Sequence, residues 1–444
     1  SSKVKHPGTF KGISEKINYL KKTGINAVLL MPSYEFEEYA FNFNYWGYGK
    51  GFYFLPKAAY SSCYGSRVDY TVEFKDMVKK FHKNGMEVYM EFNFTDEVDA
   101  CMADDCIRYW KESYHIDGAR VICNDRIRQV IADDPYLVDI KLFYEYWDNN
   151  FRNHNLLEYN EGFENVARKL LKGDEGQLKY FSECFKKNPV HGYTVNFVCD
   201  NNGFTLYDLV SYDRKHNEEN GENNRDGKDY NNSWNCGEEG DTKNRKILAQ
   251  RLRNRKNAMC FVLLSQGIPM IYAGDEFGNS QNGNNNAYCQ DNETGWLDWS
   301  ALRKNRKFYN FICTLINFRH NHKVLHIEKE LVQSDYKYFG LPDISYHGSK
   351  AWYPEMEHYN RHLGILLCGR YAEENEDIYI GMNLHWEKHI LALPKIPGKT
   401  WEIIINTNDN EGVFVGDDST IEVPPRTVVV IVSKKMVEIC NILL

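Results

Sequence analysis

The sequence predicts an α/β fold, a (β/α)8 barrel of the TIM type followed by a C-terminal antiparallel β-sandwich. Helix-like and strand-like segments alternate through the first two-thirds of the chain, as they do in parallel sheets whose strands are joined by helices. This part extends over about 300 residues, which suits one closed barrel. After Lys323 the pattern changes to alternating short strands. We therefore expect a barrel domain at residues 1–325 and a sandwich domain at residues 326–444.

The first helix and strand illustrate the barrel pattern. Ile13, Ile17 and Leu20 recur at helical spacing, and Gly24 is placed to end that helix before a buried strand at residues 26–31. Further buried strands are predicted at residues 86–90, 118–122, 138–144, 156–159, 193–198 and 269–273. This gives seven parallel strands, one fewer than a closed barrel contains.

The last part of the chain carries shorter alternating segments. Strands are predicted there at residues 378–382, 390–393, 401–405 and 427–432. Such alternation is typical of an antiparallel sandwich with one buried and one solvated face.

Composition excludes several classes of partner. The net charge is −8 and the isoelectric point is near 6.0. Phosphate binding relies on clustered Lys and Arg, so we expect no nucleic-acid partner. The twelve cysteines stand singly, without a CxxC pair or a nearby His at metal-ligand spacing, which predicts reduced thiols and no metal site. No cofactor is expected.

No apolar run approaches the roughly 20 residues that cross a bilayer. The first residues do not resemble a signal peptide. We therefore expect no membrane association and a cytoplasmic location.

Two long segments, residues 217–241 and 279–293, are rich in Asn, Gly and acidic residues. Long ordered loops over a barrel are often functional, and the same composition also fits mobile linkers. Composition leaves both interpretations open.

Long motifs lie at the predicted strand ends and in these loops. They include NYWGY at residues 44–48, NGFTLYDLVSY at 202–212, HNEENGENNRDG at 216–227, the run at 263–293, WLDW at 296–299 and HGSKAWYP at 347–354. These segments resemble glycoside hydrolase family 13 of the α-amylase superfamily, specifically its isoamylase and glycogen-debranching members. The resemblance covers nearly the entire chain. It implies that the first barrel strand lies just before Ser1, which accounts for the eighth strand.

The resemblance also implies where catalysis takes place. Retaining glycosidases need a carboxylate nucleophile and a carboxylic acid about 5 Å apart. The family's nucleophile motif resembles residues 117–122, and the nucleophile position holds Ile122. An isoleucine cannot attack an anomeric carbon or stabilise an oxocarbenium ion.

Two further catalytic positions follow from the resemblance. The general-acid motif resembles residues 144–148 and retains Glu145. The third carboxylate position holds Asn202, preceded by Asn201 where the family has His. Another family motif resembles residues 91–94 and places Phe94 at a sugar-binding His position. One of the three catalytic carboxylates therefore remains.

The predicted substrate-binding residues are Tyr48, Trp46, Arg120 and Asn201. Aromatic faces suit both sugar stacking and rim packing, and both remain open for Tyr48 and Trp46. Arg120 has lost its usual anion, so we expect it to contact Glu145, Glu91 or another carboxylate.

Plainer roles are assigned to other acidic side chains. With Ile122 at the nucleophile position, Glu145 is predicted to be an ordinary ion-pair partner rather than an acid. Asp275 and Glu276 are adjacent in a structural motif, which favours loop anchoring over paired catalysis.

We therefore predict a protein of α-glucan metabolism that binds glycogen, starch or maltooligosaccharides and has lost hydrolytic activity, with an active glucan-metabolising enzyme as candidate partner. One alternative is an active α-1,6 debranching hydrolase that uses Glu145 and a relocated carboxylate such as Glu91 or Asp200. Another is a scaffold protein without sugar binding.

Overall fold

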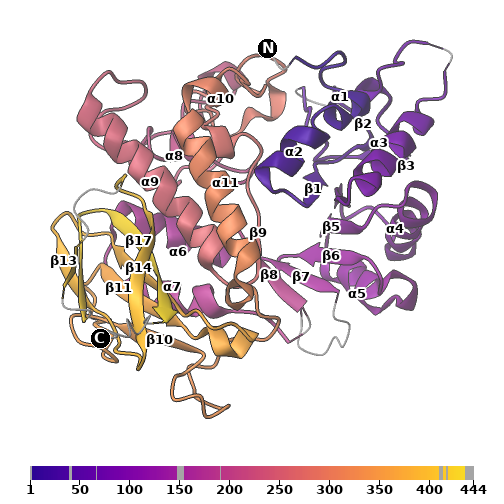
Figure 1. Ribbon diagram of the computed structural model, residues 1–444. Helices are drawn as coiled ribbons and strands as arrows, with labels where there is room; N and C mark the ends of the chain where they lie inside the picture. The colour runs from indigo at the N-terminus through magenta and orange to yellow at the C-terminus, as the bar shows by residue number, and fades with distance from the viewer. Residues whose placement is uncertain are drawn as a thin grey trace, which may run out of the picture.

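The computed structural model describes residues 3–39, 43–66, 68–147, 155–190, 192–409, 414–416 and 419–435. Figure 1 shows a helix-covered parallel sheet in the N-terminal part and antiparallel sheets in the C-terminal part. The predicted fold class is therefore confirmed.

The barrel part contains a seven-stranded parallel sheet in the order β1-β4-β5-β6-β7-β8-β9. Its strands are β1 Ala27–Leu30, β4 Glu87–Asn93, β5 Gly118–Ile122, β6 Lys141–Tyr144, β7 Leu156–Tyr159, β8 Gly192–Asn196 and β9 Ile268–Pro269. Each strand overlaps one of the seven predicted. In the part of the chain that the structure describes, β1 and β9 are the two edges of this sheet.

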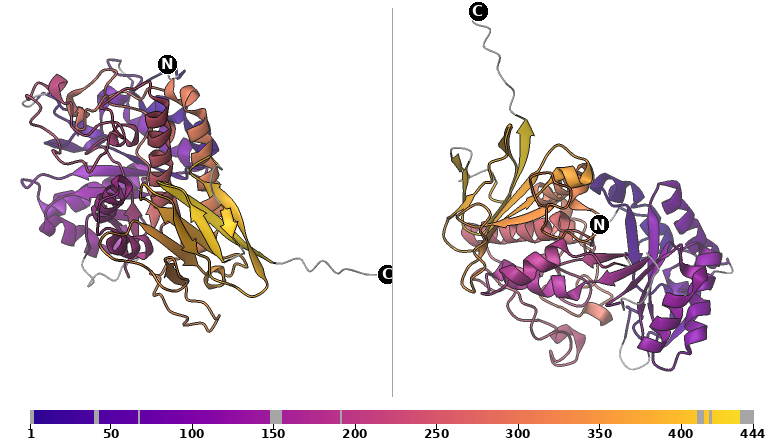
Figure 2. Two further views of the ribbon diagram at one scale, coloured as in Figure 1. Left: turned by 90° about the vertical axis from the view of Figure 1, so that its left-hand side faces the viewer. Right: turned by 90° about the horizontal axis from the view of Figure 1, so that it is seen from below.

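Helices cover the sheet, as the two views of Figure 2 show. They are α1 Phe10–Ser14, α2 Ile17–Thr23, α3 Thr71–Lys83, α4 Ala100–Tyr114, α5 Asp125–Asp133, α6 Glu161–Lys172, α7 Leu178–Lys186, α8 Leu206–Leu209, α9 Arg245–Leu264, α10 Ala301–Lys304 and α11 Arg306–Asn321. Of these, α1 and α2 precede the first strand of the sheet. Gly24 ends α2 in the left-handed conformation with φ 97°, as its sequence position predicted.

Short 3₁₀ turns connect several of these elements. They are η1 Ala58–Tyr60, η2 Pro135–Leu137, η3 Glu218–Asn220, η4 Asp275–Phe277, η5 Ala287–Cys289, η6 Lys323–Leu325 and η7 Gly369–Ala372.

A small antiparallel hairpin, which the sequence did not predict, precedes α3. Its strands are β2 Tyr34–Phe36 and β3 Gly51–Pro56. The hairpin fixes both ends of the segment that carries the NYWGY motif. The motif therefore lies in the loop between two paired strands.

The C-terminal part consists of two antiparallel sheets. The larger has the order β10-β11-β12-β17-β14, and the smaller has the order β13-β16-β15. Their strands are β10 Ile344–His347, β11 His362–Leu367, β12 Ile378–Asn383, β13 His389–Ala392, β14 Lys399–Asn406, β15 Phe414–Gly416, β16 Thr420–Val423 and β17 Thr427–Lys435. Buried side chains of both sheets, including Tyr379, Leu391, Ile421 and Ile431, form a common core.

The two predicted domains also share a core. Apolar residues of α9, such as Phe261 and Leu264, belong to the same buried cluster as Leu363, Ile380 and Val430 from the larger sheet. The boundary between residues 325 and 326 stays a prediction.

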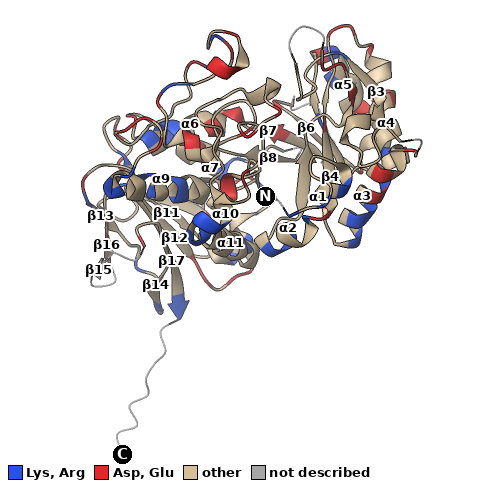
Figure 3. Ribbon diagram, turned by 90° about the horizontal axis from the view of Figure 1, so that it is seen from above, with Lys and Arg blue, Asp and Glu red and all other residues tan. Residues whose placement is uncertain are grey.

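Within the described residues, no helix has the length and apolar character that a bilayer span requires. The cysteines in that part are free thiols, and Cys440 lies outside it. The described residues contain no cluster of His, Cys, Asp or Glu suited to a metal ion. Lys and Arg are prominent on α3 and α9, which lie on opposite sides of the molecule in Figure 3 and so do not form a shared patch.

We expect one buried histidine to make stability depend on pH. His347 is fully buried, its Nδ1 accepts a hydrogen bond from the Trp352 N–H at 2.8 Å, and burial lowers its pKa to about 4. The neutral ring is thus favoured in the folded state. The unfolded state binds the additional proton, so the stabilisation is present above about pH 6.5 and is lost as the pH falls towards 4, by about 3 kcal/mol in total.

Urea unfolding at intervals between pH 4 and 7 measures this dependence. His347→Asn keeps a side-chain acceptor near Nδ1 and is expected to flatten the curve. The exposed residue His320 provides the control, because His320→Asn should leave the slope unchanged. Equal slopes in all three proteins would contradict the assignment.

Candidate functional site

A cavity of about 490 Å³ opens at the C-terminal ends of the parallel strands. This is the face of a barrel where active sites form, and the volume lies within the range of small-molecule sites. The fourteen lining residues are Asn44, Trp46, Tyr48, Asn93, Arg120, Ile122, Glu145, Glu161, Asp200, Asn201, Asn202, Glu222, Asn286 and Tyr288. The structure therefore brings all seven residues singled out from the sequence to one cavity, and their roles stay predictions.

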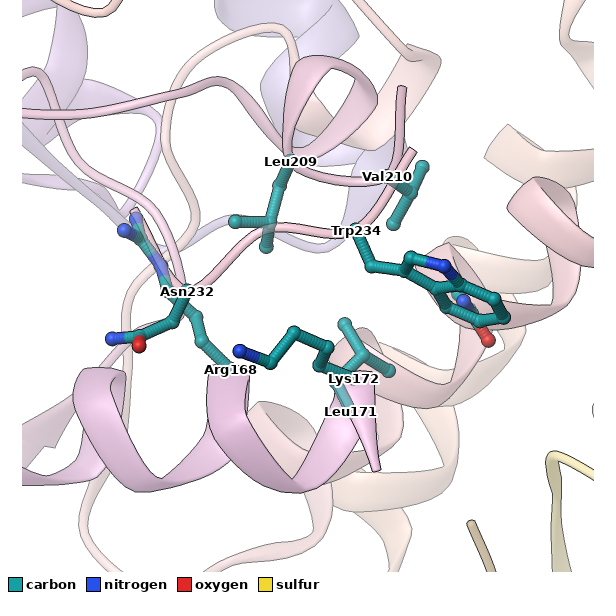
Figure 4. A pocket seen from close by; sticks show the side chains of 8 residues that line it. Arg168, Leu171, Lys172, Leu209, Val210, Asn232 and Trp234 are labelled. Atoms are coloured by element: carbon teal, nitrogen blue, oxygen red, sulfur yellow. The ribbon is translucent and has the colours of Figure 1, made fainter. Parts of the chain in front are cut away.

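A second cavity is far smaller. Its volume is about 10 Å³, and it lies against α6 beside Trp234 (Figure 4). Such a space holds about one water molecule, so it cannot accept a sugar.

Arg120, which lines the cavity, forms a buried ion pair with Glu91. They are neighbours in the parallel register of β4 and β5, and their exposed fractions are 9% and 2%. The guanidinium carbon of Arg120 also lies 3.8 Å from the ring centroid of Tyr159. Burial lowers the pKa of Arg120, but the nearby Glu91 and Tyr159 more than offset it and raise the pKa above its usual value. The expectation that Arg120 pairs with a carboxylate is confirmed.

Ile122 is the last residue of β5, and its register partner on β4 is Asn93. It is half-buried and contributes an apolar side chain to the cavity wall. The carboxylate that a covalent mechanism requires is thus absent from this strand end.

Glu145 follows β6 directly and is exposed at the cavity. Among the described residues no cation pairs with it, because Arg120 is engaged by Glu91. The prediction that Glu145 is an ordinary ion-pair partner therefore finds no support there. Asp148, the last residue of the same motif, lies outside the described residues.

Tyr48 is held by Asn201. The Nδ2 of Asn201 donates a hydrogen bond to the Tyr48 hydroxyl at 2.9 Å. Burial, followed by the charge of Glu91, raises the pKa of Tyr48 well above its usual value. The phenol therefore stays neutral, and its ring orientation is fixed at the cavity.

Asp200 is a second buried carboxylate at the cavity, 6% exposed. It accepts hydrogen bonds from the Tyr159 hydroxyl at 3.2 Å and from the backbone N–H of Asn202 at 3.0 Å. These contacts fix the orientation of the Asp200 carboxylate. Phe94, by contrast, packs against Phe92 and Tyr53 in the core and does not line the cavity.

The sequence interpretation missed several lining residues. Glu161 opens α6 directly after β7, where the Asn160 side chain caps the helix by accepting from Phe163 N–H at 3.0 Å. The sequence could have indicated Glu161, because it lies just after the end of a predicted strand. Tyr288 and Glu222 belong to different loops, and the Tyr288 hydroxyl donates a hydrogen bond to Glu222.

The two Asn-rich loops are tied together by buried amide side chains. Asn217 Nδ2 donates to Asn285 Oδ1 at 2.9 Å, and Asn220 Nδ2 donates to the Asn286 carbonyl at 2.9 Å. Asp226 accepts from both Asn220 and Asn286. This network fixes the loops as a cavity wall rather than as mobile linkers.

The predicted anchoring role of Asp275 and Glu276 is confirmed. Asp275 accepts from the backbone N–H of Leu206 at 2.8 Å. Glu276 accepts from the Tyr19 hydroxyl at 2.7 Å and from Gly274 N–H at 2.9 Å. Both carboxylates therefore hold the polypeptide around the site.

Sequence comparison finds related debranching proteins. Isoamylase 1 of Arabidopsis thaliana is 30% identical over an alignment of 519 residues with its gaps. The alignment covers 92% of this chain and 64% of the relative. A GlgX homologue of Mycobacterium tuberculosis is 33% identical over 402 residues, covering 71% of this chain and 55% of the relative. The chain thus spans less than two thirds of these relatives. No family model matches it.

Solved structures share the fold. The catalytic module of the glycogen-degrading pneumococcal virulence factor SpuA aligns with a TM-score of 0.75 at 14% identity, covering 97% of this chain and 75% of that module. A pullulanase from Bacillus acidopullulyticus aligns with a TM-score of 0.73 at 17% identity, covering 98% of this chain and 58% of that protein.

Proposed function

This chain is a homologue of the isoamylases and GlgX proteins of glycoside hydrolase family 13, and we propose that it binds α-glucans without hydrolysing them. The ligand is glycogen, starch or a maltooligosaccharide. The protein acts in the cytoplasm, with an active glucan-metabolising enzyme as its candidate partner.

One observation carries the loss of hydrolysis. Ile122 occupies the strand end at the cavity where the family resemblance puts the nucleophile. The neighbouring Arg120 is neutralised by Glu91 from the adjacent strand. Arg120 therefore has an anionic partner without a carboxylate at position 122.

Binding is supported by what the cavity still offers. Trp46 and Tyr48 present aromatic rings in a T-shaped arrangement, 6.1 Å between centroids. Asn201, Asn202 and Asp200 place amide and carboxylate groups beside them. A sugar ring combines C–H faces with hydroxyl groups, so this combination of aromatic and polar groups suits it.

Electrophoresis in gels containing glycogen tests the proposal. The unmodified protein should be retarded. Tyr48→Ala should reduce the retardation because it removes the aromatic ring and also the hydroxyl that accepts the hydrogen bond from Asn201. We expect the dissociation constant to rise about tenfold, equivalent to about 1.4 kcal/mol. Tyr230 is 90% exposed and outside the cavity, so Tyr230→Ala serves as the control.

Absence of retardation in the unmodified protein would support a scaffold that has lost sugar binding. Retardation that Tyr48→Ala leaves unchanged would place the glucan site elsewhere.

A second candidate function is a debranching hydrolase that uses Glu145 with Asp200 as the relocated carboxylate. The observation in its favour is that Asp200 lines the same cavity and is oriented by two hydrogen bonds. Glycogen turnover that requires both side chains would establish it. Glu91, the other candidate for a relocated carboxylate, is disfavoured because it is buried and paired with Arg120.

A further inference from the structure

A row of aromatic rings extends outward from the cavity along the loop between β2 and β3. Tyr39 and Phe43 are 67% and 50% exposed. Their ring centroids lie 5.0 Å apart, and Phe43 stacks on Tyr45 at 6.2 Å with an interplanar angle of 18°. Exposed aromatic rings gathered in one place mark binding surfaces more often than isolated ones do.

The inner end of this row joins the cavity. Tyr45 N–H donates to the carbonyl of Tyr288 at 2.8 Å, and the carbonyl of Tyr45 accepts from the Tyr60 hydroxyl at 3.0 Å. The next residue, Trp46, contacts the ring of Tyr288 at 6.5 Å between centroids. Trp46 and Tyr288 both line the cavity, so the backbone of Tyr45 joins the exposed rings to the rings of the cavity wall.

The base of the row is held by local hydrogen bonds. Asn44 Oδ1 accepts from the backbone N–H groups of Trp46 at 2.9 Å and Gly47 at 3.2 Å. The Asn44 N–H donates to the Glu38 carbonyl at 2.9 Å. These bonds fix the backbone that carries the rings before a ligand arrives, which lowers the entropic cost of binding.

We propose that Tyr39, Phe43 and Tyr45 form an outer binding site for an α-glucan chain whose inner end occupies the cavity. This inference rests on the proposed glucan binding. A single file of rings fits a chain ligand, whose successive sugar units each present an apolar C–H face. Glu38 pairs with Lys57 at 3.2 Å, and the carboxylate of Glu37 beside the rings favours a neutral ligand over an anionic one.

The length of the sugar ligand distinguishes binding at the outer site from binding in the cavity. Isothermal titration with maltotriose and with maltoheptaose compares the unmodified protein with a Tyr39→Ala/Phe43→Ala double variant. We expect the dissociation constant for maltoheptaose to rise about tenfold, because each aromatic contact is worth about two- to tenfold in affinity. Binding of maltotriose should be unchanged, since the cavity is intact. Tyr39→Ala alone should give a smaller loss for maltoheptaose, and its highly exposed site should leave folding unaffected.

The matched control is Tyr230→Ala/Tyr338→Ala, which removes two rings that are 90% and 93% exposed elsewhere. It should bind both sugars normally. Maltoheptaose binding that survives in the Tyr39→Ala/Phe43→Ala variant would overturn the outer site while leaving cavity binding in place. Failure of the unmodified protein to bind either sugar would overturn both proposals. A variant that loses affinity for both sugars equally would show that the rings support the cavity instead of extending it.

Discussion

Reducing ends should be released from glycogen no faster by the unmodified protein than by its Glu145→Gln variant. Covalent glycosidase catalysis divides one difficult displacement into two easier steps, and Ile122 excludes the first of them. Acid catalysis by Glu145 alone supplies typically about 10²- to 10⁴-fold, whereas enzymes accelerate their reactions by at least about 10⁶-fold. The difference is large enough to measure with a standard reducing-sugar assay.

Restoring carboxylates is not expected to recover turnover. In an Ile122→Asp/Asn202→Asp variant, Asn201 still stands where the family resemblance places a sugar-binding His, and Arg120 remains paired with Glu91. Robust turnover by the unmodified protein that disappears in Glu145→Gln would overturn the non-catalytic proposal. Asp200→Asn would then test whether Asp200 is the relocated carboxylate.

Loss of the Glu91 carboxylate should destabilise the protein strongly. Glu91→Gln leaves the buried guanidinium of Arg120 without its anion, and breaking a buried pair from one side costs about 3–5 kcal/mol. The midpoint of urea unfolding should fall accordingly, with little change in the dependence on denaturant.

A control on the same strand isolates burial as the cause. Glu87 pairs with Lys141 at 2.7 Å, and their side chains are 42% and 39% exposed. Glu87→Gln should cost no more than about 1 kcal/mol because water screens this pair. Similar losses from both substitutions would mean that the Arg120–Glu91 pair is not a buried structural contact.

The parallel strands were predictable because each is a short buried run followed by a helix. β5 and β7 begin and end at their predicted residues. The β2–β3 hairpin was not predictable in this way. Its strands are short, their burial is irregular, and their register shifts because Tyr34 pairs with Pro56 but Glu35 pairs with Phe52. Neither a period of two nor a helical period therefore emerges from that segment.

The site was predictable only where a residue follows a strand directly. Ile122 and Glu145 could be placed in this way, since strand ends meet on one face of a barrel. The contact between Tyr288 and Glu222 joins residues 66 positions apart in two loops. The pairing of Arg120 with Glu91 rather than Glu145 likewise depends on the β4–β5 register, which sequence spacing does not specify.

The burial of helix α9 determines how the protein unfolds. Every residue from Asn254 to Leu264 is buried, so this half of the helix has no face that could be exposed to water without loss of stability. Barrel helices and the larger sandwich sheet cover it jointly. Neither part can detach while the other stays intact, and we expect the described structure to unfold cooperatively, in one transition.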